Sequence, residues 1–399
     1  MRNLRRVGLG VGVGVLSLAI SAPSASANGS SGHAWGQAQL TGWAALPAAT
    51  FVSASDPSGA LLGGTPSNGI TPPFDDQPIQ GFSGILKNGD GTFDVISDNG
   101  YGNKANSGDF VLRIHRVAPD YAKKTVDVVG GINLTDPSGF VPWALTRKDR
   151  VLTGADFDIE SIQRVGDGSY WIGDEFGPYL LHFDRAGRLL QAPISLPGVR
   201  APENPEGNPN LNSSKGFEGM ALSPDGRTLY PMLEGTVAGD PAGSLRFNEF
   251  DLVKQRYTGK IYTYQMEDPG YSIGDAIAVD ADRFLIIERD QGQGATAKFK
   301  RIYLADKRDR NRDGKMDKTL VADLMNIADP RHLGGTSNVF TFPFQTIEDV
   351  VILDDRTLGV VNDNNFPFSS GRTPGKPDDD EFITIRLANN LHADKRFLR

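Results

Sequence analysis

Short apolar runs alternate with tight turns and acidic residues, and this pattern recurs five times along the chain. In the copy at 158–190, Glu160 precedes a short apolar run, residues 166–168 read Gly-Asp-Gly, and a second β-rich run at 170–172 leads into Asp174. Asp-Gly between two β-rich runs is a strong hairpin signal, because glycine adopts the positive φ of a tight turn without steric cost. The pattern predicts antiparallel hairpins with acids at the strand ends on one side.

The other copies lie at 83–99, 218–234, 275–290 and 348–364. Their first positions are separated by 77, 58, 57 and 73 residues, and they are Ser83, Glu160, Glu218, Asp275 and Glu348. These intervals exceed the roughly 40–50 residues of familiar propeller repeats, but they accommodate four strands and long loops. We predict an all-β fold, a β-propeller of six blades, with five or seven as alternatives.

Strands outside the five hairpins complete this prediction. Two of them, at 109–117 and 125–134, are expected to form the sixth blade or to share one with the termini. The segments 39–50 and 381–387 are expected to share one blade, so that the N- and C-terminal strands close the ring and remove exposed edges. We expect residues 39–399 to form a single domain.

The N-terminus has the pattern of a secretory signal peptide. Residues 1–27 combine Arg2, Arg5 and Arg6 with an apolar run at 7–20 and a small-residue cleavage site that ends at Ala27. The apolar run is short for a bilayer, so we expect cleavage near Ala27 and secretion rather than a membrane span. Residues 28–38, rich in Gly and Ser, are expected to form a flexible leader.

Charge and cysteine content narrow the function. The chain has 41 Lys and Arg, 49 Asp and Glu and no Cys; without the three signal arginines, 38 basic residues remain and the net charge is −11. An acidic surface argues against nucleic acid and against anionic membranes as partners. A secreted chain without disulfides must be held by its core or by metal ions. We expect a monomer.

The repeated acids predict a metal centre. Equivalent positions of the blades converge near the axis, where clustered carboxylates repel one another unless a cation compensates. Ca²⁺ fits because it takes six to eight oxygen ligands, whereas the scattered histidines and missing cysteines disfavour Zn²⁺. The alternative is that some acids only cap strand ends. The expected metal ligands are Asp98, Asp174, Glu175, Asp275 and Asp363, and we expect Glu234, Glu288 and Asp290 to crowd the same place.

A second acidic segment, at 309–317, predicts a separate calcium loop. Asp309, Asn311 and Asp313 alternate, Gly314 permits a sharp turn, and Asp317 adds a further carboxylate, as in the front half of an EF-hand loop. Position 12 of that pattern is a leucine, so the bidentate Glu is missing. The alternative is a solvated charged turn.

Several longer motifs carry a resemblance to a known family. They are GFSG at 81–84, SDNG at 97–100, DIES at 158–161, GDEFGPYLLHFD at 173–184, GFEGMALSPDG at 216–226 and NDNNFP at 362–367. In this set and order the chain resembles the bacterial phytase-like family, which is named for the esterase-like activity of phytase. The resemblance covers most of the chain. It implies a secreted β-propeller and a hydrolase, with a small-molecule ester or phosphoester as the expected substrate.

The phosphoesterase interpretation assigns three roles. Glu160, Glu218 and Glu348 are the expected catalytic carboxylates, together with calcium ions that neutralise phosphate and activate water. Lys215 and Arg289 are the expected phosphate-binding cations, unless they only pair with the neighbouring acids. No dense Lys/Arg cluster appears, which argues against phytate as the substrate. The alternatives are a calcium-dependent lactonase or carboxylesterase, and a non-catalytic binding propeller with structural calcium.

Overall fold

The computed structural model describes residues 35–398, so the predicted signal peptide and most of the predicted leader lie outside the described residues. Within this range the chain is all-β, apart from two short 3-10 helices at Ala60–Leu62 and Gly294–Thr296. None of the helices found there has the length and apolar character needed to cross a membrane. The last leader residues are packed: the Trp35 N–H donates to the Leu320 carbonyl at 3.1 Å, and Ala38 is buried.

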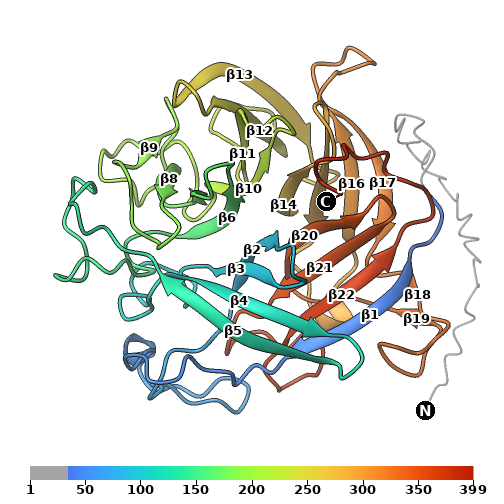
Figure 1. Cartoon of the computed structure of the whole chain (residues 1–399), viewed down its shortest axis with the longest axis horizontal. Coiled ribbons are helices and arrows are strands. Elements are labelled where there is room, and N and C mark those ends of the chain that lie inside the picture. Colours follow the sequence, from blue (N-terminus) through green and yellow to red (C-terminus); the bar gives the residue numbers. More distant parts are fainter. Residues whose placement is uncertain (1–34, 399) are drawn as a thin grey trace, which may run out of the picture. The chain divides into compact units, whose positions relative to one another are not determined.

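Twenty strands form five antiparallel groups of four, and each group is one blade of a propeller (Figure 1). Three blades are separate sheets, whereas a parallel bridge between Ala45 and Thr125 joins the outer strands of the first and last blades into one larger sheet. Blade 1 contains β2 (Phe82–Lys87), β3 (Phe93–Ser97), β4 (Arg113–Asp120) and β5 (Thr125–Asn133). Blade 2 contains β6 (Ile159–Arg164), β7 (Tyr170–Asp174), β8 (Tyr179–Phe183) and β9 (Ile194–Ser195). Blade 3 contains β10 (Phe217–Leu222), β11 (Thr228–Leu233), β12 (Ser244–Asp251) and β13 (Arg256–Gln265). Blade 4 contains β14 (Ser272–Ala278), β15 (Arg283–Arg289), β16 (Lys300–Asp306) and β17 (Asp317–Asp323).

Blade 5 is built from both ends of the chain. It contains β20 (Thr346–Asp354), β21 (Thr357–Asp363), β22 (Asp380–Arg386) and, outermost, β1 (Gln39–Leu46). β1 is antiparallel to β22, with Trp43 opposite Ile383, so the predicted closure by the N- and C-terminal strands is confirmed. The short strands β18 (Ile327–Ala328) and β19 (Val339–Phe340) extend this sheet. The chain continues from β1 into blade 1. The pairing of β1 with β22 therefore joins the last blade of the ring to the first.

The ring has five blades, not the six that we predicted. The innermost strands β2, β6, β10, β14 and β20 pack side by side in this order, and β20 returns to β2 (Figure 1). The strands expected to form a sixth blade are β4 and β5, which instead pair with β3 as the outer half of blade 1. The long first interval in the sequence reflects the loops around these two strands.

The core lies between the blades. Five apolar clusters each join two neighbouring sheets around the ring. Between blades 3 and 4, for example, the rings of Phe247 and Phe284 meet edge to face with centroids 4.7 Å apart. Such interfaces bury both faces of every sheet, which holds the inner strands close around the axis.

Candidate active site at the propeller axis

A β-bulge occurs at the same point of all five innermost strands. In β2 the register shifts between Phe82 and Gly84, so that Ser83 is the extra residue. Equivalent shifts occur in β6, β10, β14 and β20. The five bulge residues are Ser83, Glu160, Glu218, Gly274 and Glu348. A bulge bends the strand and re-aims a side chain, and here it turns the residue toward the axis.

The second strand of each blade contributes one further residue to the axis. Phe82 pairs with Ser97, for example, and the next residue, Asp98, lies beside the bulge. The equivalent positions in the five blades are Asp98, Glu175, Glu234, Arg289 and Asp363. Four-stranded blades in a closed ring therefore place ten equivalent side-chain positions around one point, and seven of them are carboxylates.

Measured contacts confirm that these positions meet. Carboxylate oxygens of Asp158, Glu160 and Glu175 lie within 4.8 Å of one another, and so do those of Glu175, Glu218 and Glu234. All five of these residues are buried, and Glu175 belongs to both groups. Ser83 Oγ in blade 1 lies 3.1 Å from Glu348 Oε2 in blade 5, which completes the ring. We call Asp158 and the seven axial carboxylates the axial cluster.

Two cations face the axial cluster. Arg289 Nη2 lies 2.8 Å from Glu348 Oε1 and 3.7 Å from Glu218 Oε1. Lys215 Nζ forms an ion pair with Glu234. Blade 4 supplies Arg289 where the other blades supply an acid. Its bulge residue is Gly274, because any Cβ there would lie 1.9 Å from the Ile347 carbonyl oxygen of blade 5.

The local electrostatics disfavour the ionised carboxylates. Burial raises the pKa of Glu160 well above its usual value, and the nearby charges of Asp158 and Glu218 raise it further. Burial, followed by Glu234, has the same effect on the pKa of Glu175 and on that of Glu218. Burial also raises the pKa of Glu348 to about 8. Eight carboxylates against two cations leave an excess of negative charge at this point.

Two carboxylate oxygens of the axial cluster are left without a hydrogen-bond partner in the described part of the chain. Both Glu175 Oε1 and Glu218 Oε1 are completely buried and accept no hydrogen bond, although Glu218 Oε1 lies 3.7 Å from Arg289 Nη2. An unpaired buried oxygen of a carboxylate is costly, so an additional donor or cation is expected there. Hard oxygen ligands without nitrogen or sulfur suit Ca²⁺. The donor set therefore fits the predicted metal.

Two predicted ligands turn away from the axis. Asp275 was aligned with the bulge acids, but the bulge residue of β14 is Gly274; a one-residue shift directs Asp275 into blade 5, where it accepts the Val350 N–H at 3.0 Å. Asp174 accepts the backbone N–H groups of Asp158 at 2.9 Å and Gly177 at 2.7 Å. Burial raises the pKa of Asp275 to about 7 and that of Asp174 to about 8. Asp174 caps the end of its strand, which is the alternative considered above, whereas Asp275 binds a backbone N–H in the middle of the neighbouring blade's innermost strand.

The acids that flank Arg289 do not join the axial cluster. Glu288 accepts from the Tyr264 hydroxyl at 2.8 Å and pairs with Lys318 at 2.9 Å. Asp290 pairs with the buried Lys300 at 2.9 Å. Side chains alternate along a strand, so when Arg289 points to the axis its two neighbours point away. The expected crowding of these two acids is wrong for that reason.

Asp158 was not singled out from the sequence. It holds the cluster to its surroundings: Asn99 Nδ2 donates to Asp158 Oδ1 at 2.7 Å, and Ser214 Oγ lies 2.9 Å from Asp158 Oδ2. The sequence does contain a signal for it. Asp158 and Glu160 are two residues apart, and this spacing places two side chains on the same side of a strand. Asp98 and Asp363 lie at axial positions as expected, and Thr346 Oγ1 donates to Asp363 Oδ2 at 3.1 Å.

The predicted calcium loop at 309–317 is an exposed turn between β16 and β17. Asp309 accepts the N–H groups of Asp313 and Gly314, both at 3.0 Å. Asp313 accepts the Lys315 N–H at 2.9 Å, and Asp317 accepts the Arg310 N–H at 2.8 Å. Asn311 also accepts the Asp313 N–H. The loop's own backbone therefore satisfies one oxygen or more of each side chain, and calcium binding here stays a prediction.

A cavity of about 450 Å³ opens beside the axial cluster between blades 3 and 4. Its lining includes Lys215, Glu234, Tyr271, Gln291 and Asn212. This volume is in the range of ordinary small-molecule sites. Glu234 is the axial carboxylate that lines this cavity, and its ion-pair partner Lys215 lies in the same wall.

The family assignment follows from comparison with known proteins. The sequence model of the phytase-like family, described as esterase-like activity of phytase, matches residues 77–366. The chain belongs to the phytase-like family. This phytase-like chain is also 29% identical over 185 residues to an uncharacterized secreted protein of Arthroderma benhamiae, in an alignment that covers 36% of each protein.

Solved structures resemble the phytase-like chain more distantly. A luciferin-regenerating enzyme gives a TM-score of 0.38 with 11% identity, over 77% of this chain and 78% of the other. A GH43 β-1,3-galactosidase gives a TM-score of 0.42 with 10% identity, over 77% of this chain and 57% of the other. Likeness at this level carries no argument about activity, so the function must be argued from the site.

Proposed function

We propose that this phytase-like protein is a secreted, calcium-dependent hydrolase of small esters, with phosphate monoesters as the first candidate substrates. The observation that carries the proposal is Glu175, which belongs to two groups of converging carboxylates and has a completely buried oxygen without a partner. Secretion is supported by the signal-peptide pattern of residues 1–27 and by the description of the fungal relative.

The carboxylate groups are the proposed calcium ligands. Asp158, Glu160 and Glu175 would hold one ion, and Glu175, Glu218 and Glu234 would hold a second. When bound, calcium supplies positive charge that offsets these carboxylates and stabilises the developing charge of an ester substrate. Asp98 and Asp363 occupy the equivalent axial positions of blades 1 and 5 and are the proposed further oxygen ligands.

The remaining axial side chains take the substrate-binding and proton-transfer roles. Glu348 lies outside both groups and is fixed by Ser83 and Arg289. We assign it as the carboxylate that accepts a proton from the attacking water, with Oε2 as the accepting atom. Arg289 and Lys215 bind the anionic oxygens of the substrate, because each presents its donors to the centre from a fixed ion pair.

The shortage of free cations limits the substrate. Arg289 and Lys215 are the two basic side chains that contact the described axial carboxylates, and both already have partners. Such a site suits one phosphate or carboxylate group and is a poor match for a densely phosphorylated molecule. For the same reason a carboxylesterase or lactonase is the second candidate function.

A direct assay separates these functions. Purified mature protein is tested with p-nitrophenyl phosphate and p-nitrophenyl acetate in calcium and after chelation. We expect calcium-dependent phosphate release, reduced about 100-fold or more by Glu218→Gln with the melting temperature in calcium unchanged within a few degrees. Glu206→Gln makes the same substitution at an exposed position away from the axial cluster. It serves as the control and should retain full activity.

Other outcomes would redirect the assignment. Release of acetate alone, with the same sensitivity to Glu218→Gln, would favour the carboxylesterase. Absence of turnover with both substrates, in a protein that calcium still stabilises, would contradict the hydrolase and favour a binding propeller.

A further inference from the structure

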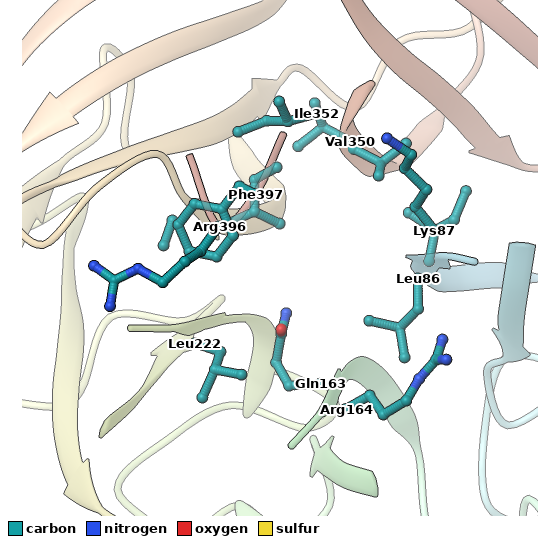
Figure 2. Close-up of a pocket in the computed structure, with 13 residues that line it drawn as sticks. Leu86, Lys87, Gln163, Arg164, Leu222, Val350, Ile352, Arg396 and Phe397 are labelled. Atoms are coloured by element: carbon teal, nitrogen blue, oxygen red, sulfur yellow. The ribbon is translucent and has the colours of Figure 1, made fainter. Parts of the chain in front are cut away.

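The axis has a second end whose chemistry differs from that of the axial cluster. The positions three and four residues beyond each bulge lie about 10–13 Å farther along the innermost strands, at the rise of a strand. A cavity of about 330 Å³ lies there (Figure 2). Nine of the ten residues at these positions line it, so all five blades contribute: Leu86, Lys87, Gln163, Arg164, Leu222, Ile277, Ala278, Val351 and Ile352.

The wall of this cavity, which we call the lower pocket, is apolar with a basic rim. Most of its lining is aliphatic, and Phe397 adds an aromatic ring. Its charged side chains are Lys87, Arg164 and Arg396, and no carboxylate is part of the lining. This is the opposite of the axial cluster, in a chain whose formal charge is −8.

The cations of the rim differ in their partners. Lys87 Nζ donates to the Leu353 carbonyl oxygen at 3.0 Å and takes part in no ion pair of the described chain. Arg396 binds both carboxylate oxygens of Asp394, two residues away, and its side chain is 51% exposed. Arg164 lies 3.4 Å from Asp94 and donates to Asn88 Oδ1 at 2.6 Å, while its Nε is buried without a partner. Lys87 is therefore the rim cation whose charge no described carboxylate offsets.

The C-terminal segment builds one side of the lower pocket. The Asp394 N–H donates to the Val279 carbonyl at 2.8 Å, and the Ala393 N–H donates to Asp355 Oδ1 at 2.8 Å. These bonds fix the segment on blades 4 and 5. Figure 2 shows Arg396 and Phe397 on one side of the pocket and Lys87 and Arg164 on the other.

We propose that the lower pocket binds a small amphiphilic monoanion of the medium-chain carboxylate type. The alkyl chain covers the aliphatic wall and removes it from water, and the carboxylate accepts a charge-assisted hydrogen bond from Lys87. Arg396, on the opposite side of the mouth, adds positive charge that favours an anion. The volume is at the lower limit of ordinary ligand sites, which suits a single chain. This binding does not depend on the proposed hydrolase activity, because it uses none of the axial residues.

The test is a binding assay on the mature protein in calcium. 8-Anilinonaphthalene-1-sulfonate, itself an amphiphilic anion, serves as the fluorescent probe. Decanoate is expected to displace it, decanol to displace it about tenfold more weakly, and decyltrimethylammonium to leave it bound. Equal displacement by the anionic and cationic decyl compounds would overturn the proposal, as would a lack of probe binding.

Variants locate the binding. Lys87→Gln combined with Arg396→Gln removes two rim charges and should weaken decanoate binding about tenfold, with little effect on decanol. Lys254→Gln combined with Arg256→Gln makes the same charge change where β13 begins, at exposed positions, and should leave decanoate binding unchanged. Ile277→Trp fills the cavity and should abolish probe binding. If this variant does not fold, the Lys87 and Arg396 double variant still tests the proposal. Unaltered decanoate binding in the Lys87 and Arg396 variant contradicts the proposal.

Discussion

The axial cluster and the loop at 309–317 are both dense in acids, and the sequence predicts calcium at both. Their surroundings differ completely. Glu175 and Glu218 in the axial cluster are buried and each keeps an oxygen that accepts no hydrogen bond, whereas Asp309 is half-buried, Asp313 is exposed, and both accept backbone N–H groups of their own turn. The number of acids is thus a weak guide, and the balance of burial and hydrogen bonding separates the two places.

This difference has an energetic basis. An exposed carboxylate keeps most of its hydration, and a short turn supplies enough N–H donors to stabilise it without an ion. Buried carboxylates lose hydration and repel one another at short range. The axial cluster therefore depends on cations that the fold or the solvent supplies, and the loop does not.

Arg289 should give the largest effect on stability, because it is the internal cation of the axial cluster. In calcium-free protein we expect Arg289→Met to lower the free energy of unfolding by about 3–5 kcal/mol, since Glu348, Glu218 and Glu234 lose their shared partner. Urea unfolding in a chelator measures this change. Arg246→Met, which breaks a half-exposed pair with Asp240, should cost less than about 1 kcal/mol. Equal costs for the two variants would show that the axial charges are screened.

Calcium removal should have the next largest effect. With free calcium at about 100 times its Kd, binding adds about 3 kcal/mol to folding stability, and chelation removes it. For a chain of this size we expect the melting temperature to fall by roughly 5–10 °C. Scanning calorimetry with and without chelator gives the shift.

A matched variant assigns that calcium effect to the axis. In Glu175→Gln the melting temperature should depend only weakly on calcium, because this residue belongs to both ligand groups. If Glu175→Gln keeps the full calcium response, the stabilising ion lies elsewhere, and the loop at 309–317 becomes the first place to look.

The sequence predicts the architecture better than the details of the site. Repeated hairpins with acids at their ends identify the propeller, and alternating apolar termini identify the shared blade. The blade number was wrong because β4 and β5 carry no repeat motif, and the sequence does not show whether two additional strands form a new sheet or extend an existing one. Strand pairing decides this, and it depends on contacts far apart in the chain.

A shift of one residue explains most errors in the site. Asp275 follows the bulge residue Gly274, and Glu288 and Asp290 flank Arg289; each is one position away from an axial position. Side chains alternate between faces, so such a shift turns an acid from the axis into a blade interface. Asp158 escaped notice because its role depends on Asn99 and Ser214, which come from other loops. The type of a residue is visible in the sequence, but its direction is fixed by the bulge.

The smallest effect is expected from the loop itself. Asp309→Asn combined with Asp313→Asn removes two charges and keeps the Asp313 oxygen that accepts the Lys315 N–H. It also replaces one of the two Asp309 oxygens, which accept the Asp313 and Gly314 N–H groups, by an amide NH2. We expect the free energy of unfolding to fall by less than about 1 kcal/mol, since one solvent-accessible hydrogen bond is lost, and the calcium-dependent rise in melting temperature to stay intact. Calorimetry in calcium and in chelator measures both quantities. If the double variant loses much of that rise, calcium binds at the turn as the sequence pattern predicts, and the local hydrogen bonds describe only its calcium-free form. If the rise is preserved, burial rather than acid count determines where this protein binds calcium.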